Sequence, residues 1–530
     1  MTSQELLPVA VLTSILFVVA SLLRGWRTTI RLPFPPGPKP KFLLGNLFDI
    51  PSEQPWLTYT KWGKQYGDVV HLQVFGNHIL ILNSAKAATE LLEKRAILYS
   101  DRPTIPMVPL SGAEWMLLLM QHGDRWREHK RIFHQYFRRE AIPAYRPIQL
   151  RKIQDLLRGL LSAPEDFEAH LKTVAAAIIM ATIYGHDIIQ HTHDRFVSLA
   201  EEGGKRFNGS VLPGAFAVNT FPFLRHFPSW FPGCGFHRFA QGTAKILDKM
   251  KNAPFEFVRQ NMRDGVGKSC VLSELLDHND TQYGGSKERE EVIENVTGVA
   301  YAATAETTSA ILVLFIMAMA IHPEVVRKAQ NEIDTVVGAG VLPGFEHRSA
   351  LPYCEAVLRE VFRWKPIAPL GFPHATSDDD IYRGYFIPKG LVFFYRRVFQ
   401  DIDIVLGTTV LPNIWAMVHD ESIYPNPDQF NPERFLNADG QLNTDDRILG
   451  FGFGRRICIG RYAADAIVWA TMVSVLSTFN ISKAKDANGN TIEIEVAFLH
   501  GVVSHPKPFK CDITPRNDGA RKLIENLTDV

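Results

Sequence analysis

The sequence has few cysteines, and they lie far apart. The five are Cys234, Cys270, Cys354, Cys458 and Cys511. None of them forms a CxxC pair, which argues against a zinc ribbon and against a thioredoxin-type redox site. An odd number of scattered cysteines is typical of a reducing compartment with free thiols.

The chain also lacks net charge, internal repeats and low-complexity tracts. It has 57 Lys and Arg against 56 Asp and Glu, a net charge of +1, so there is no global attraction for nucleic acid and we expect no such partner. Helical periodicity dominates, with shorter β-like runs near His71–Leu82 and Tyr382–Ile387. This predicts one large, mainly α domain with a minor β part, from residue 42 to 530.

The N-terminus contains a long uncharged stretch, Leu6–Leu23. Its 18 residues would form a helix about 27 Å long, close to the hydrocarbon thickness of a bilayer. A cleaved signal peptide is the alternative, but no Lys or Arg precedes the stretch, whereas Arg24, Arg27 and Arg31 follow it. We therefore predict a transmembrane anchor at 1–24 and a cytosolic domain beyond it.

Three further segments bear on the membrane. Residues 25–41 are basic and then proline-rich, which predicts a stiff extended linker. Ala310–Ile321 is apolar but too short to span, which favours a buried core helix. Phe221–Phe239 is rich in aromatics and proline, and two interpretations stay open: a loop that dips into the membrane, or a loop that caps the core.

The strongest chemical signal is the run Phe451–Gly460, in which a thiol lies among glycines and arginines just before a helix. Gly454 and Gly460 would let the backbone turn sharply and approach a flat cofactor. The helix N-terminus and the nearby guanidiniums are expected to favour the thiolate form of Cys458. A structural cysteine is one alternative; a dinucleotide loop is excluded because the third glycine of that motif is missing.

This decapeptide resembles the haem-binding loop of cytochromes P-450. The matching positions are Phe451, Gly454, Arg456, Cys458 and Gly460. The resemblance implies the cytochrome P-450 fold with haem b (iron-protoporphyrin IX) between the I and L helices and Cys458 as the metal ligand. Thiolate ligation promotes O–O cleavage, so it also implies a monooxygenase. The spacing of other segments is most similar to fungal O-methylsterigmatocystin oxidoreductase-like enzymes.

Two further motifs resemble the parts of that family which bind the haem propionates. Trp126 and Lys130 match a C-helix Trp-x-x-x-Arg motif, with lysine in place of arginine. Lysine keeps the charge but loses the bidentate fork, and the neighbouring Arg131 is an alternative partner. His374 and Arg456 are similar to the other propionate partners.

Residues 303–308 resemble the oxygen-binding segment of the I helix. Its chemistry needs an acid and a hydroxyl to deliver protons, and Glu306 and Thr307 supply them as the predicted catalytic residues. The alternative is a threonine that bonds to its own helix backbone. Thr304 stands where the family usually has glycine, which would narrow the oxygen groove.

Glu360 and Arg363 resemble the Glu-x-x-Arg pair of the K helix. By itself such a pair would be a surface salt bridge worth under about 1 kcal/mol. The resemblance instead implies a buried structural network that also contains Arg434.

The resemblance also implies partners and a location. Electrons would come from NADPH through NADPH-cytochrome P-450 reductase, which a basic cluster in residues 125–139 could dock. The substrate would be an apolar small molecule, in fungal secondary metabolism or xenobiotic oxidation, and the location the endoplasmic reticulum membrane. Two alternatives are a haem-thiolate isomerase or dehydratase and a non-catalytic relative without haem.

One segment departs from the family pattern. Seventeen residues, Leu391–Gly407, lie between a Pro-Lys-Gly turn and the strand that should follow it directly. Aromatic residues are frequent in this segment, which is costly on a soluble surface. Our hypothesis is a translated intron; the alternative is a real inserted loop that touches membrane or a partner.

Overall fold

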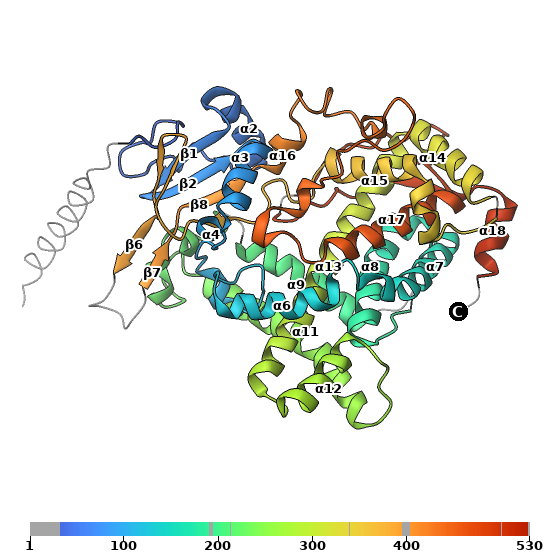
Figure 1. The fold of residues 1–530 in the computed structure, drawn as a ribbon, viewed down its shortest axis with the longest axis horizontal. Coiled ribbons are helices and arrows are strands. Elements are labelled where there is room, and N and C mark those ends of the chain that lie inside the picture. The colour runs from blue at the N-terminus through green and yellow to red at the C-terminus, as the bar shows by residue number, and fades with distance from the viewer. Residues whose placement is uncertain are drawn as a thin grey trace, which may run out of the picture.

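The computed structural model describes residues 32–189, 194–211, 214–338, 340–394, 403–499 and 501–527. Helices fill most of the molecule, and the strands β1, β2 and β8 lie at one side together with α2, α3 and α16 (Figure 1). The predicted mainly α domain with a minor β part is confirmed. The predicted anchor at 1–24 lies outside the described residues.

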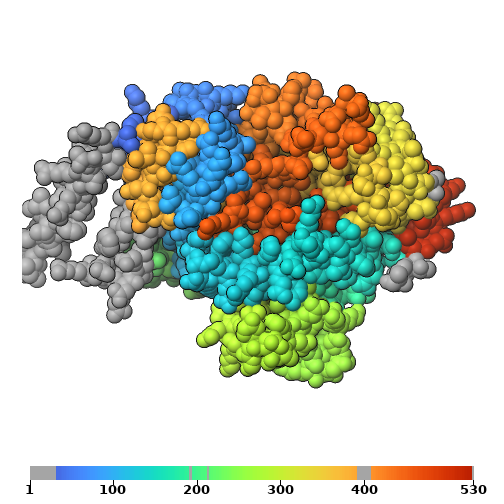
Figure 2. Space-filling view, in the orientation of Figure 1, coloured from blue at the N-terminus to red at the C-terminus, as the bar shows by residue number. Residues whose placement is uncertain are grey.

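The helices turn apolar faces inward, and several of them begin at a proline. The longer ones are α2 Pro55–Tyr66, α6 Asp124–Phe137, α7 Arg146–Ser162, α8 Phe167–Tyr184, α9 Arg195–Val211, α11 Phe236–Arg263, α12 Val271–Tyr283, α13 Lys287–Ile321, α14 Pro323–Val336, α15 Pro352–Trp364, α17 Arg461–Thr478 and α18 Asp518–Glu525. The short ones are α3 Ala85–Ala88, α4 Ala96–Tyr99, α5 Met107–Leu110, α10 Ala217–Thr220 and α16 Ile414–Val418. Together α11 and α12 form a lobe that projects from the body (Figure 2).

The core is built around α13. Ser286 caps this helix by accepting a hydrogen bond from the Arg289 amide, and Glu288 and Glu290 in the first turn complement its dipole. Residues 310–320 are all buried, against α8, α15 and α17. The predicted core helix at Ala310–Ile321 is therefore confirmed. Two helical stretches, 164–184 and 287–321, are long and apolar enough to span a bilayer, but most of their residues are buried within the protein.

The main sheet has four strands in the order β1-β2-β8-β3. Strands β1 (Val69–Val74) and β2 (Asn77–Leu82) form a hairpin, as the β-like run predicted; β8 (Thr409–Pro412) runs parallel to β2, and β3 (His374–Ala375) antiparallel to β8. Three two-stranded pairs complete the β part: β4 Asp380–Tyr382 with β5 Tyr385–Ile387, β6 Leu391–Phe394 with β7 Asp403–Leu406, and β9 Phe479–Lys483 with β10 Cys511–Pro515.

The second half of the predicted linker is docked on the domain. The Pro36 carbonyl accepts a 3.0 Å hydrogen bond from the His71 amide, and the Pro33 carbonyl a 2.8 Å bond from the Phe386 amide. A side chain at Gly37 would lie 2.0 Å from the His71 carbonyl oxygen. The proline-rich segment thus packs against β1 and β5.

The 17-residue segment leaves and re-enters the fold at one point. Strands β6 and β7 pair with each other, with Leu391 opposite Leu406. The Thr408 amide donates a 3.2 Å hydrogen bond to the Lys389 carbonyl, and the Thr408 hydroxyl donates to the Pro388 carbonyl at 2.6 Å. Residues on the two sides of the segment are therefore already in contact without it.

Deletion of residues 391–407 should give a folded protein that is at least as stable as the full chain. The contacts between Lys389 and Thr408 close the gap. Removal of 17 residues from the loop also reduces the entropic cost of closing it, by about 2 kcal/mol. Thermal unfolding and haem content of the deletion variant test this. A second variant with a glycine–serine segment of equal length separates the effect of length from that of sequence. Loss of folded protein in both variants would show that the segment is an integral part of the domain.

Candidate functional site

The loop before α17 is held by backbone contacts. The Cys458 amide donates a 2.8 Å hydrogen bond to the Phe451 carbonyl and closes the loop. Gly454 has a φ of +56°, and a Cβ there would lie 2.0 Å from the Leu92 carbonyl oxygen. The expected sharp turn is present at Gly454, but the group that approaches this glycine closely is the Leu92 backbone and not a cofactor. Gly460 has a φ of −79°, which any residue adopts.

The side chain of Cys458 is exposed, yet the surrounding protein desolvates it and raises the pKa of its thiol. From these two observations together we infer that the thiol borders an internal space. The Gly460 backbone and the Arg461 charge lower that pKa, but burial outweighs both. The expectation that the loop by itself favours the thiolate is therefore wrong. A bound metal ion would remove the proton, because a coordinating thiol is deprotonated outright.

The middle of α13 also opens inward. Ala303 is exposed although the helix is buried on both sides of it, and Ala302, Thr304 and Thr307 are half-buried. Since α13 packs against α17, the loop that carries the thiol leads into a helix that neighbours this stretch of α13. These two helices correspond to the expected L helix (α17) and I helix (α13).

Two arginines lie near this interior, Arg102 buried and Arg456 half-buried. The Arg456 guanidinium donates to the Ser100 carbonyl at 2.8 Å and to the Met120 carbonyl at 2.7 Å. The Arg102 guanidinium donates to the Leu118 carbonyl at 2.7 Å and to the Pro373 carbonyl at 2.6 Å. Within the described residues neither guanidinium has a carboxylate at ion-pair distance. Both side chains are thus fixed by neutral carbonyls, and the Asp101 charge offsets only part of the cost of their burial.

Trp126, Lys130 and His374 lie with these arginines, and we call these five residues the cation cluster. The Trp126 ring lies 4.5 Å from the Arg456 guanidinium and 4.9 Å from the Lys130 ammonium. The ammonium also donates to the Arg455 carbonyl at 2.6 Å. His374 is buried, and its Nδ1 bonds the Tyr99 carbonyl at 2.8 Å. Arg131 is exposed, so Lys130 is the residue that lies with Trp126.

The electrostatics of the cluster favour an anion. Burial lowers the pKa of Arg102 to about 9, with the Arg456 charge as the next cause, and lowers the pKa of Arg456 to about 10. Burial, then the two arginines, lower the pKa of His374 to about 3, and burial lowers the pKa of Lys130. Burial therefore disfavours the charged form of each of these four side chains. A ligand that carries two carboxylates, as haem does, would stabilise the charged forms and fits this cluster.

The predicted acid and hydroxyl make different contacts. The Thr307 hydroxyl donates to the Ala303 carbonyl at 2.8 Å, which is the helix-backbone contact considered as the alternative. The Glu306 carboxylate lies between two other elements: Oε1 is 3.0 Å from Nδ2 of Asn208 in α9 and 3.0 Å from Nε2 of His505 near the C-terminus. The structure does not join Glu306 and Thr307 by a direct hydrogen bond.

The comparison with known families decides the identity. A family model described as Cytochrome P450 matches residues 35–395 and 396–513. The chain belongs to the cytochrome P450 family. It is therefore a haem-thiolate monooxygenase, an oxidoreductase that incorporates oxygen, and the family implies haem, a redox partner and a small-molecule substrate. The two matched stretches meet inside the 17-residue segment.

The relatives of this P450 are fungal monooxygenases of the same length. Cytochrome P450 monooxygenase COX1 of Coprinopsis cinerea is 37% identical over 533 residues, covering 99% of each chain. Cytochrome P450 monooxygenase 208 of Postia placenta is 39% identical and covers 97% of this chain and 95% of its own. Tryptamine 4-monooxygenase of Psilocybe cyanescens is 36% identical and covers 94% and 96%. The finer likeness to O-methylsterigmatocystin oxidoreductase stays a prediction.

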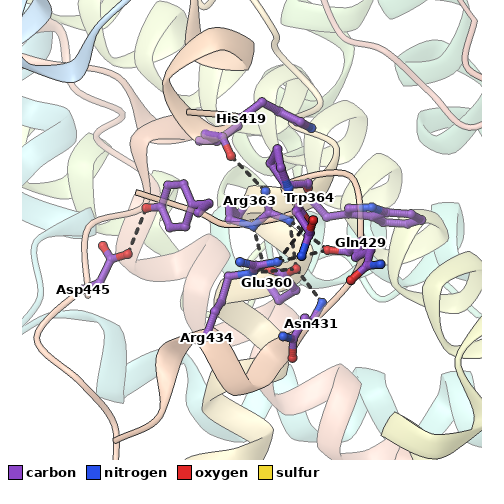
Figure 3. Close-up of polar contacts among 12 residues, drawn as sticks. Glu360, Arg363, Trp364, His419, Gln429, Asn431, Arg434 and Asp445 are labelled. Atoms are coloured by element: carbon purple, nitrogen blue, oxygen red, sulfur yellow. Dashed lines mark hydrogen bonds and ion pairs between the residues drawn. The ribbon is translucent and has the colours of Figure 1, made fainter. Parts of the chain in front are cut away.

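A buried ion-pair network braces the P450 outside the cluster (Figure 3). Glu360 is completely buried and accepts from the Arg363 guanidinium at 2.6 and 2.9 Å. Arg434 approaches the same carboxylate to 3.3 Å, and the Asn431 amide donates to it at 2.7 Å. The network of Glu360, Arg363 and Arg434 is confirmed, and the alternative of a surface salt bridge is wrong.

Sequence reasoning missed three residues of the site. None of the predicted cofactor or catalytic motifs includes Arg102, Asn208 or His505. Arg102 follows an aspartate and precedes a proline, which gives no sign of burial. Asn208 and His505 lie 98 and 199 residues away from Glu306 in the sequence. Neither periodicity nor spacing brings such distant residues together, so only the tertiary structure could find them.

Proposed function

We propose that this P450 holds haem b through Cys458 as metal ligand, with Trp126, Lys130, His374 and Arg456 binding the propionates. Arg102 joins them. The observation that carries this proposal is the incompletely balanced cation cluster beside an inward-facing thiol. Two desolvated guanidiniums with only the partial compensation of Asp101 are costly, and two propionates would offset that cost.

The proposed reaction inserts one oxygen atom of dioxygen into an apolar small molecule and releases the other as water. When bound, haem supplies the activation of dioxygen. The protein supplies protons through Glu306 and Thr307. One relative is named for tryptamine, but the substrate expected here is an apolar compound of secondary metabolism or a xenobiotic.

The proposed electron source is NADPH, through NADPH-cytochrome P-450 reductase. The exposed face of α6 carries Arg125, Arg127 and Arg131, and two more exposed arginines, at positions 138 and 139, follow the end of the helix. Arg127 pairs with Asp124 at 2.5 Å and Arg125 with Glu291 at 3.8 Å, but the face remains rich in positive charge. Lys130 turns inward to the cluster and does not belong to this face. An acidic donor surface would be attracted to it.

The proposed location is the endoplasmic reticulum membrane, with 1–24 as a single-pass anchor, 25–41 as linker and the catalytic domain cytosolic. The aromatic-rich segment Phe221–Phe239 supports membrane contact. Its inner side packs in a small core with Val218, Cys234 and Phe236, while Trp230 is 80% exposed and Phe223 48% exposed. The segment therefore both caps a core and presents aromatic rings outward, where they suit a membrane interface.

Purified wild-type protein should show the reduced carbon monoxide difference spectrum of a haem-thiolate protein and oxidise NADPH when reductase is added. A spectrum without any NADPH oxidation would favour the isomerase or dehydratase alternative, which needs no reductase. The absence of any haem spectrum after reconstitution with haem would favour the non-catalytic alternative. Reductase with boiled P450 is the matched control for NADPH oxidation.

A further inference from the structure

His505 and Glu306 form an ion-pair contact that no motif of the sequence accounts for. His505 Nε2 lies 3.0 Å from Glu306 Oε1, and both side chains are about one quarter exposed, 25% and 21%. Within the described part of the chain, Glu306 is the ionisable group at ion-pair distance from His505. The pair therefore has contact with water on one side and with the helix that carries Thr307 on the other.

The hydrogen bonds fix the direction of the contact. Asn208 Nδ2 can only donate, so Glu306 Oε1 is an acceptor at 3.0 Å. The same oxygen faces His505 Nε2, which must then carry the proton that lies between the two groups. Nδ1 of His505 has no partner within the described residues. It is therefore the ring nitrogen available to water.

The surroundings are shaped around this pair. A Cβ at Gly204 in α9 would lie 2.3 Å from Glu306 Oε2, so a glycine is what leaves room for the carboxylate. The His505 segment is held on both sides: the Ser504 amide donates to the Ile367 carbonyl and the Leu499 amide to the His505 carbonyl, each at 2.7 Å. The imidazole is therefore presented to Glu306 by a fixed backbone.

We propose that His505 is a proton-relay residue that supplies Glu306 from solvent; the proposal rests on the proposed monooxygenase function. A hydronium ion of the solvent protonates Nδ1 and becomes water, and the Nε2 proton passes to Glu306 Oε1, which leaves a neutral imidazole protonated on Nδ1 and a carboxylic acid. The acid releases the proton toward Thr307 and returns to the carboxylate. The imidazole loses its Nδ1 proton to water and takes up a solvent proton at Nε2, which restores the original tautomer. Histidine suits this step because one ring nitrogen can accept a proton while the other donates one.

The relay is tested with His505→Gln, which can still donate a hydrogen bond to Glu306 but cannot pass a proton. We expect NADPH-supported oxygen consumption with reductase to fall about tenfold. The solvent deuterium isotope effect on that rate should rise, and the carbon monoxide spectrum should stay that of wild type. Adding Glu306→Gln should cause no further loss, because both residues act in one path. His186→Gln is the matched control, since His186 forms a similar pair with Asp194 at 2.8 Å elsewhere in the fold.

A readout without turnover comes from thermal unfolding of His505→Ala, Glu306→Ala and the double variant. Their losses of stability should be less than additive, because the two residues share one contact. Additive losses, or an unchanged rate and isotope effect in His505→Gln with an intact spectrum, would overturn the relay. A wild-type protein without the haem-thiolate spectrum would instead overturn the proposed function, and the relay with it.

Discussion

Cys458→Ala abolishes the haem-thiolate absorption of this P450 while the polypeptide stays folded. Cys458 is the cysteine of the family loop, and its side chain is exposed to the interior. Removing one inward-facing sulfur leaves the α13–α17 packing intact, so the loss should be confined to the iron ligand. The measurements are the reduced carbon monoxide difference spectrum, haem content and the thermal unfolding midpoint.

The matched control for Cys458→Ala is Cys511→Ala. Cys511 is also a free cysteine, half-buried in β10, and lies outside the motif. Its replacement should leave the spectrum unchanged. If Cys458→Ala protein held the pigment with unaltered absorption, the assignment of the axial ligand would be untenable.

Glu360→Ala should destabilise the protein by about 3–5 kcal/mol, the usual cost of breaking a buried ion pair. The substitution leaves the guanidiniums of Arg363 and Arg434, 3% and 8% exposed, without the carboxylate that balances them. It also removes the acceptor of the Asn431 amide. Equilibrium unfolding in denaturant measures the loss, together with the yield of haem-loaded protein.

Glu421→Ala is the control for Glu360→Ala. Glu421 pairs with Lys64 at 3.8 Å, and both side chains are more than 70% exposed. An exposed pair of this kind contributes about 0–1 kcal/mol, so this variant should unfold almost as wild type does. Equal effects of the two substitutions would mean that the Glu360 network contributes no more than a surface ion pair.

The two halves of the proposed cofactor site differ in how far the sequence indicated them. The loop around Cys458 is contiguous, so its glycines, arginines and thiol are visible as one motif. The anion-binding side is assembled from four separate segments, and Arg102 was recognised only when the fold showed it beside Arg456. The thiol's pKa was predicted with the wrong sign because burial cannot be judged from neighbours in the chain.

By itself the sequence determined the family, the mainly α fold, the core helix at Ala310–Ile321 and the partners Glu360, Arg363 and Arg434. These predictions rest on local periodicity and on motifs. The members of a motif are either close in the chain or recognised because the family's motifs follow one another in a fixed order. Only the tertiary structure decided that Arg102 joins the cation cluster, that Thr307 bonds its own helix and that His505 meets Glu306. Such contacts depend on burial and on the meeting of distant segments, and neither quantity is encoded in the spacing of residues along the chain.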